Sequence, residues 1–70
     1  MRKQPNIYDI VVQSHADDAT LWRVVEHFEK YEVGIIDAEL EEAHPNQRVQ
    51  YIGIEGLMKP NHKQMQRLTS

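Results

Sequence analysis

The stretch that decides the predicted fold is SHADDATLWRVVEHFEKYEVG, residues 14–34. Ser14 and Asp17 match the capping-box pattern of a helix start, and acids in a first turn suit the helix dipole. At about 100° per residue, a helix over residues 15–32 gathers the large apolar side chains on one stripe. These side chains are Leu21, Val24, Val25, Phe28 and Tyr31. Gly34 follows where a left-handed cap ends a helix, so we predict a helix over residues 15–32.

Strands are predicted on both sides of this helix. Residues 7–13 are rich in β-branched and aromatic types, which favours a strand. Residues 35–42 and 48–55 flank the turn signal His44-Pro45-Asn46 and are expected to form a hairpin. Side chains alternate between the two faces of a strand, so a pairing that gathers the apolar residues places Ile36, Ala38 and Leu40 on the same face as Ile52 and Ile54.

The two ends of the chain complete the predicted order. Pro60 suits the first position of a helix, so residues 60–68 are expected to form a short amphipathic helix. Residues 1–6 are expected to be a flexible N-terminus. The chain, residues 1–70, is then a single α+β domain of order β-α-β-β-α, an open sheet with helices on one face.

This order is similar to a ferredoxin-like fold that lacks its last strand, as in the ACT domains that sense amino acids. The resemblance implies a regulatory module that binds a metabolite between two subunits. In such an arrangement the long helix packs onto the sheet. The predicted contacts place Leu21, Val25 and Phe28 on Tyr8, Ile10, Val12, Ile36, Leu40 and Ile52.

Composition sets the expected class and compartment. The 70 residues contain no cysteine and carry a formal net charge of −3. Acids gather between Glu26 and Glu42, and Lys59, Lys63 and Arg67 make the tail basic. The lack of cysteine fits a reducing compartment, and no apolar run approaches membrane-spanning length. A cytoplasmic protein with no membrane contact is expected.

No catalytic, cofactor-binding or metal-binding residue is predicted. The four histidines stand far apart in the sequence and lack zinc-site spacing. Ser14, His15 and Asp17 are adjacent at a predicted helix start, whereas a hydrolytic triad converges from separate segments. Gly53 and Gly56 have the spacing of an RNA-clamping loop, but an acid lies between them and they follow a strand. An enzyme is therefore the least favoured class.

An acidic sheet face is the strongest functional feature of the sequence. Like charges on one face repel unless a basic partner complements them, and aromatic residues are common in binding hot spots. The expected partner-binding residues are Asp37, Glu39, Glu41, Tyr51, Glu55 and Trp22. We expect a small non-enzymatic regulatory or inhibitory protein that binds a basic protein partner there. The alternatives are an ACT-like metabolite-sensing module and weak nucleic-acid binding through the basic C-terminal helix.

A homodimer is also expected, because strand 7–13 would be an open edge in the predicted order. That edge carries a single charge, Asp9, and an unguarded apolar edge favours pairing with a second copy. The expected interface residues are Tyr8, Ile10, Val11 and Val12.

Overall fold

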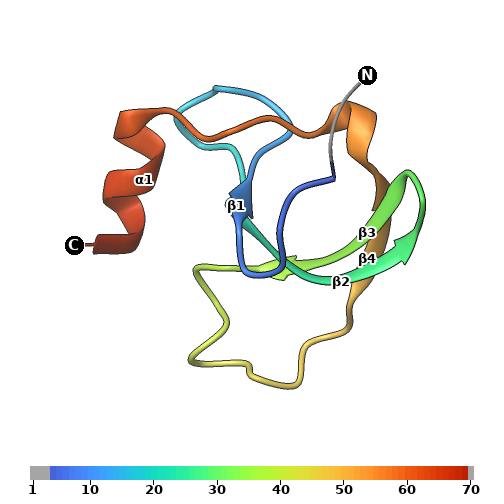
Figure 1. The fold of residues 1–70 in the computed structure, drawn as a ribbon. Helices are drawn as coiled ribbons and strands as arrows, with labels where there is room; N and C mark the ends of the chain where they lie inside the picture. Colours follow the sequence, from blue (N-terminus) through green and yellow to red (C-terminus); the bar gives the residue numbers. More distant parts are fainter. Residues whose placement is uncertain (1–3, 70) are drawn as a thin grey trace.

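A computed structural model describes residues 4–69 of the chain (Figure 1). Its main feature is a four-stranded antiparallel sheet in which neighbouring strands follow the order of the sequence, β1-β2-β3-β4. The strands are β1 (Ile10–Val11), β2 (Trp22–Glu29), β3 (Glu32–Asp37) and β4 (Gln50–Gly53). A 3₁₀ turn, η1 (Ile54–Gly56), and a helix, α1 (His62–Thr69), complete it. Residues 4–69 therefore form an α+β structure, whose order is neither β-α-β-β-α nor ferredoxin-like.

The prediction of a helix over residues 15–32 was wrong, because this stretch forms a loop followed by β2 and the turn into β3. The physical reason is two irregularities in the β2–β3 register, between Val24 and Glu26 and between His27 and Glu29. Each extra residue in a bulge shifts the two-residue alternation of a strand. The apolar residues recur at spacings of three and four, as in a helix, but they do not share one buried face: Val24 is buried, whereas Phe28 and Tyr31 are about half exposed.

The strand predicted over residues 7–13 is much shorter than expected. Tyr8 adopts a positive φ of 77°, a left-handed conformation that interrupts an extended strand. One edge of β1 pairs with β2, and on the other side Val12 forms an antiparallel bridge with Met58. The open edge expected for this strand was therefore wrong, and the argument for a homodimer through it loses its basis.

The predicted hairpin of residues 35–42 and 48–55 is correct in its antiparallel pairing but not in its length or register. Asp37 ends β3, so the second half of the first predicted strand lies in a loop. Val33 pairs with Ile52 and Ile35 with Gln50, so Ile52 shares a face with odd-numbered residues of β3. The predicted placement of Ile52 with even-numbered residues was wrong, because the register pairs Glu32 with Gly53 and so sets odd-numbered residues of β3 opposite even-numbered residues of β4.

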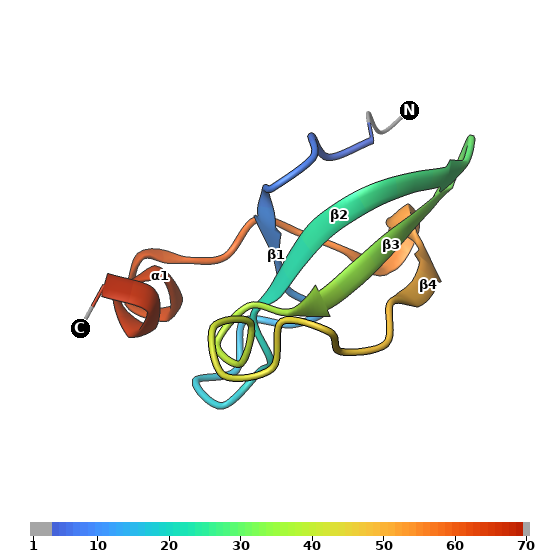
Figure 2. The same ribbon diagram turned by 90° about the horizontal axis from the view of Figure 1, so that it is seen from below.

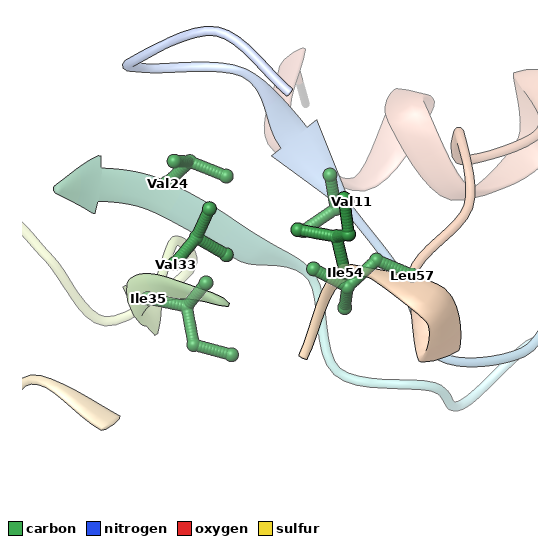
Figure 3. Packing of buried hydrophobic residues seen from close by; sticks show 6 residues of the cluster. All are labelled: Val11, Val24, Val33, Ile35, Ile54 and Leu57. Atoms are coloured by element: carbon green, nitrogen blue, oxygen red, sulfur yellow. The ribbon is translucent and has the colours of Figure 1, made fainter. Parts of the chain in front are cut away.

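The core lies inside the curl of the sheet. Figure 3 shows the larger cluster, which joins the first three strands to η1 and the residue after it: Val11, Val24, Val33, Ile35, Ile54 and Leu57. A second cluster contains Val12, Leu21 and Ala38, with Leu68 of α1 packed against it. Phe28, predicted to be central, is 53% exposed, and Tyr8 is 70% exposed. The predicted packing of Phe28 onto Tyr8 was therefore wrong, whereas Leu21 is buried as expected.

The helix α1 begins close to the predicted position and is held by polar contacts. Asn61 and Gln64 form a reciprocal capping pair, in which each side-chain oxygen accepts the other residue's backbone N–H. Figures 1 and 2 both place α1 at the opposite end of the molecule from the turn between β2 and β3. Within residues 4–69, no helix has the length and apolar character needed to cross a membrane.

Candidate functional site: an aromatic and acidic sheet surface

A row of three residues crosses the middle of the sheet. Glu26 of β2 pairs with Gly34 of β3, which pairs with Tyr51 of β4. A Cβ at Gly34 would lie 3.1 Å from Cε1 of Tyr51 and 2.7 Å from Cγ1 of Val49. The missing side chain therefore leaves room for the tyrosine ring to lie across β3.

Tyr51 uses this room to reach the far strand. Its phenol O–H donates to Oε1 of Glu26 over 2.8 Å. The hydrogen bond to the Glu26 carboxylate, together with desolvation and the negative charge, raises the pKa of Tyr51 above its ordinary value. The phenol thus remains a hydrogen-bond donor throughout the physiological range.

Phe28 lies against the same ring. The ring centroids of Phe28 and Tyr51 are 4.6 Å apart and the planes are inclined by 48°, a tilted arrangement that aromatic pairs favour. The bulge beside Phe28 takes it out of the alternation that would bury it. Both rings remain about half exposed, at 53% for Phe28 and 49% for Tyr51.

Acidic side chains surround the two rings. Glu26, Glu29 and Glu32 are exposed, and Glu29 lies directly opposite Glu32 in the sheet. Like charges in that position destabilise a sheet. Among residues 4–69, no basic side chain forms an ion pair with any of the three. We call Glu26, Phe28, Glu29, Glu32 and Tyr51 together the hairpin surface.

The predicted acidic face is not brought together on the sheet. Glu39 and Glu41 lie in the loop after β3, where Glu39 pairs with Arg67 at 2.5 Å and Glu41 with Arg23 at 2.6 Å. Asp37 ends β3, and its carboxylate accepts the backbone N–H of Glu39. These carboxylates therefore already have partners within the chain.

The other predicted site residues are divided between the core and the surface. Trp22 packs against the larger core cluster from β2, Glu55 is exposed on η1, and Tyr51 is the one that joins the hairpin surface. Of the expected interface residues, Val11 and Val12 are buried. Sequence reasoning missed Glu26, Phe28 and Gly34 as site residues, because the predicted helix separated them from Tyr51.

The basic tail is also largely engaged. Lys63 pairs with Asp17 at 3.0 Å, and Arg67 donates to the backbone carbonyls of Asp17 and Ala19 as well as to Glu39. The hydrogen bond and charge of Glu39 raise the pKa of Arg67 further above its ordinary value. Two of the three predicted tail cations thus serve to hold α1 against the loops.

Two of the four histidines form hydrogen bonds to backbone carbonyls of distant residues. His15 Nε2 donates to the carbonyl of Lys59 and His27 Nε2 to that of Pro5, each over 2.7 Å, because a carbonyl can only accept. In residues 4–69 no three His, Cys, Asp or Glu side chains are grouped so that they could hold a metal ion.

One open hollow is lined by residues outside the hairpin surface, although one of them, Gln4, donates to the backbone carbonyl of Glu29. It has a volume of about 490 Å³ and lies between residues 4–6, β1 and residues 54–59. Ile10, Leu57 and Met58 contribute apolar lining, and Asp9 and Lys59 contribute charge. The Asp9 carboxylate accepts the backbone N–H of Asn6, so it already has one partner.

The fold and its surfaces define a small antiparallel β-sheet protein with a docked helix and an aromatic, acidic sheet face. Comparisons of the chain with protein-family models, with curated proteins and with solved structures found no match.

Proposed function

We propose that the protein is a non-enzymatic regulatory or inhibitory protein that binds a basic segment of another protein through the hairpin surface. The single observation that carries this proposal is the half-exposed Phe28–Tyr51 pair, set among glutamates that have no basic partner in residues 4–69. The predicted basic partner is kept, and its binding site moves from Glu39 and Glu41 to the sheet.

The chemistry of the surface favours arginine and lysine side chains. A cation over an aromatic face is attracted by the ring quadrupole, and the surrounding carboxylates add a negative potential. Lys30 already illustrates this attraction, since its ammonium lies 5.4 Å from the centroid of Tyr31. Acids beside exposed rings also suppress partners of the wrong charge.

The two alternative functions have less support. Phosphate groups would be repelled by the acids of the hairpin surface, and Lys63 and Arg67 are engaged with Asp17 and Glu39. A metabolite could use the open hollow beside β1, but the Asp9 carboxylate there already accepts the backbone N–H of Asn6.

The direct test is calorimetric titration with a synthetic peptide that has arginine at alternate positions and threonine or valine between them. We expect binding at low ionic strength that weakens at about 1 M salt, where the Debye length falls to about 3 Å. A peptide with glutamate in place of arginine should not bind.

Phe28→Ala and Leu40→Ala form a matched pair of variants, because both side chains are about half exposed, at 53% and 47%. We expect Phe28→Ala to weaken peptide binding about tenfold, as hot-spot aromatics do, and Leu40→Ala to leave it unchanged. Failure of the arginine peptide to bind, or equal effects of the two substitutions, would contradict the proposal.

A further inference from the structure

The outer edge of β4 is the starting point. Along an antiparallel pair, the backbone groups of successive residues point alternately toward and away from the neighbouring strand. The N–H of Asp37, the last residue of β3, donates to Oε1 of Gln47, on the side away from β2. The next N–H along the chain, that of Ala38, points the other way and donates to the carbonyl of Leu21, beside β2. Odd-numbered residues of β3 therefore direct their backbone groups toward β4.

The same alternation fixes β4. Gln50 and Ile52 lie opposite the odd-numbered Ile35 and Val33, so their backbone groups face β3. The N–H of Ile54, the next even-numbered residue, donates to the carbonyl of Tyr31, which confirms that even-numbered residues direct their backbone groups toward β3. It follows that the N–H and C=O groups of Tyr51 and Gly53 point outward from the sheet.

Among residues 4–69, no hydrogen bond from a turn, loop or cap engages the N–H groups of Tyr51 and Gly53 or the C=O of Tyr51. The C=O of Gly53, the N-cap of η1, accepts the first hydrogen bond of that 3₁₀ turn. The opposite edge of the sheet differs, because Met58 closes it through paired hydrogen bonds with Val12. The sequence of β4 also lacks the lysine or proline that commonly guards an exposed edge. The edge is therefore a template for one more strand.

Gly53 supplies a second, independent observation. Its backbone is extended, with φ −71° and ψ 142°, a conformation that any residue adopts. A Cβ there would come no closer than 3.7 Å to another atom, the carbonyl oxygen of Tyr31. Neither the backbone nor the packing requires glycine. Its absent side chain leaves an open path over the sheet from the outer edge to Glu32, which pairs with it.

We infer that the edge of β4 accepts an extended basic segment of the partner as an added antiparallel strand, with a basic side chain that crosses Gly53 to pair with Glu32. This inference rests on the proposed function and specifies how the partner binds. Two strand spacings separate the new strand from β3, about 10 Å, which an arginine and a glutamate side chain span together. The partner residue opposite Tyr51 lies on the same face and contacts its ring.

Charge favours this partner over a second copy of the chain. Two exposed glutamates lie near Gly53: Glu32 is opposite it in β3, and Glu55 follows it in η1. Two β4 strands paired about a two-fold axis would bring the glutamates of both copies to one interface, where like charges oppose association. A basic strand neutralises the same groups.

The test uses the alternating arginine peptide in three forms: unmodified, N-methylated at the arginines, and N-methylated at the residues between them. In the proposed geometry the arginines lie opposite Tyr51 and Gly53. The N–H of the arginine opposite Tyr51 donates to the Tyr51 carbonyl, whereas the intervening N–H groups face solvent. We expect N-methylation at the arginines to abolish binding and N-methylation between them to leave it within about threefold.

Equal binding by the two methylated peptides would overturn strand addition while leaving the proposed function intact. No binding by the unmodified peptide would overturn both. A dimer in light scattering, with the amides of Tyr51 and Gly53 protected from hydrogen exchange before any peptide is added, would assign the edge to a second copy and also overturn the inference.

Gly53→Val tests the open path on the protein side. We expect the variant to fold at least as stably as the parent, because valine suits an extended strand, and to bind the unmodified peptide at least tenfold more weakly. Gly53→Ala should give a smaller loss, and Gly56→Ala, where a Cβ meets nothing within 4 Å, no loss. Unchanged binding by a folded Gly53→Val protein would overturn the path to Glu32.

Discussion

The two ends of the molecule use similar residues for different purposes. At the end that carries α1, polar side chains are satisfied within the chain: Glu39 by Arg67, Glu41 by Arg23, and Asp17 by Lys63. At the end that carries the β2–β3 turn, Glu29 and Glu32 lie opposite each other, and Phe28 and Tyr51 remain half exposed. The helix end therefore stabilises the fold through ion pairs, whereas the acids of the hairpin end have no basic partner within residues 4–69.

Gln64 is the clearest example of a polar side chain at the α1 end whose hydrogen bonds are made within the chain. It is almost fully buried, its side-chain oxygen accepts the N–H of Asn61, and its amide nitrogen donates to the carbonyls of Ser14 and Ala16. All the hydrogen-bonding capacity of the side-chain nitrogen is thus used to join α1 to the loop that precedes β2.

The largest effect is expected from Gln64→Ala. The substitution removes half of the capping pair and leaves two carbonyls without their donor, so the free energy of unfolding should fall by about 2–4 kcal/mol. Urea denaturation measures this loss. Gln66→Ala, on the exposed side of the same helix, should change stability by less than about 0.5 kcal/mol. Similar losses from both substitutions would show that the helix end is not held by Gln64.

A smaller loss is expected from Gly34→Ala at the hairpin end. The new Cβ would overlap Val49 and press on Tyr51, so the free energy of unfolding should fall by about 1–3 kcal/mol. Adding Val49→Ala removes the closer of the two contacts. In a double-mutant cycle, the pair should therefore lose less than the sum of the single losses. Strict additivity would mean that Gly34 is not needed for this close packing.

Removal of a single acidic charge should change the free energy of unfolding in opposite directions at the two ends of the molecule. Glu41→Gln breaks an ion pair with Arg23 and should lower the free energy of unfolding by about 1 kcal/mol or less. Glu32→Gln relieves the repulsion with Glu29 and should raise it by about 0.2–0.5 kcal/mol. Thermal unfolding of both variants at low salt measures the difference. A loss of the same size for both would remove the distinction between the two ends.

The smallest effect is expected in the titration of Tyr51. Its hydrogen bond to Glu26 raises its pKa in the folded protein, so this contact contributes stability below the ordinary value of 10.0 and loses it as the pH rises through the raised value. Glu26→Gln should lower the pKa of Tyr51 toward 10.0, measured by tyrosinate absorbance in a Tyr8→Phe, Tyr31→Phe background. No downward shift would contradict the contact.

Part of the fold could be predicted from local patterns. The turn between residues 35–42 and 48–55, the short helix after Pro60 and the burial of Leu21 all follow from nearby residues. The long helix could not be excluded in this way, because the apolar residues of this stretch have a helix-like spacing, and the exposure of Phe28 and Tyr31 is set by contacts with distant residues. Pairing of Val12 with Met58 is a long-range contact that no local pattern indicates.

The candidate site shows the same limit. Tyr51 was recognised as a binding residue, but its assembly with Glu26 depends on the register that places Glu26, Gly34 and Tyr51 in one row. Glu39 and Glu41 were chosen because they alternate with apolar residues. Their arginine partners, Arg67 and Arg23, are distant in the sequence, so that neutralisation was not visible.

The most direct measurement is an NMR titration of the ¹⁵N-labelled protein with the alternating arginine peptide, which reports the binding surface residue by residue. If the hairpin surface is the binding site, the amides of residues 26–32 and 50–53 should shift in proportion to bound peptide. The amides of residues 39–41 and 63–67 should stay in place. Shifts confined to residues 39–41 and 63–67 would contradict the assignment of binding to the hairpin end.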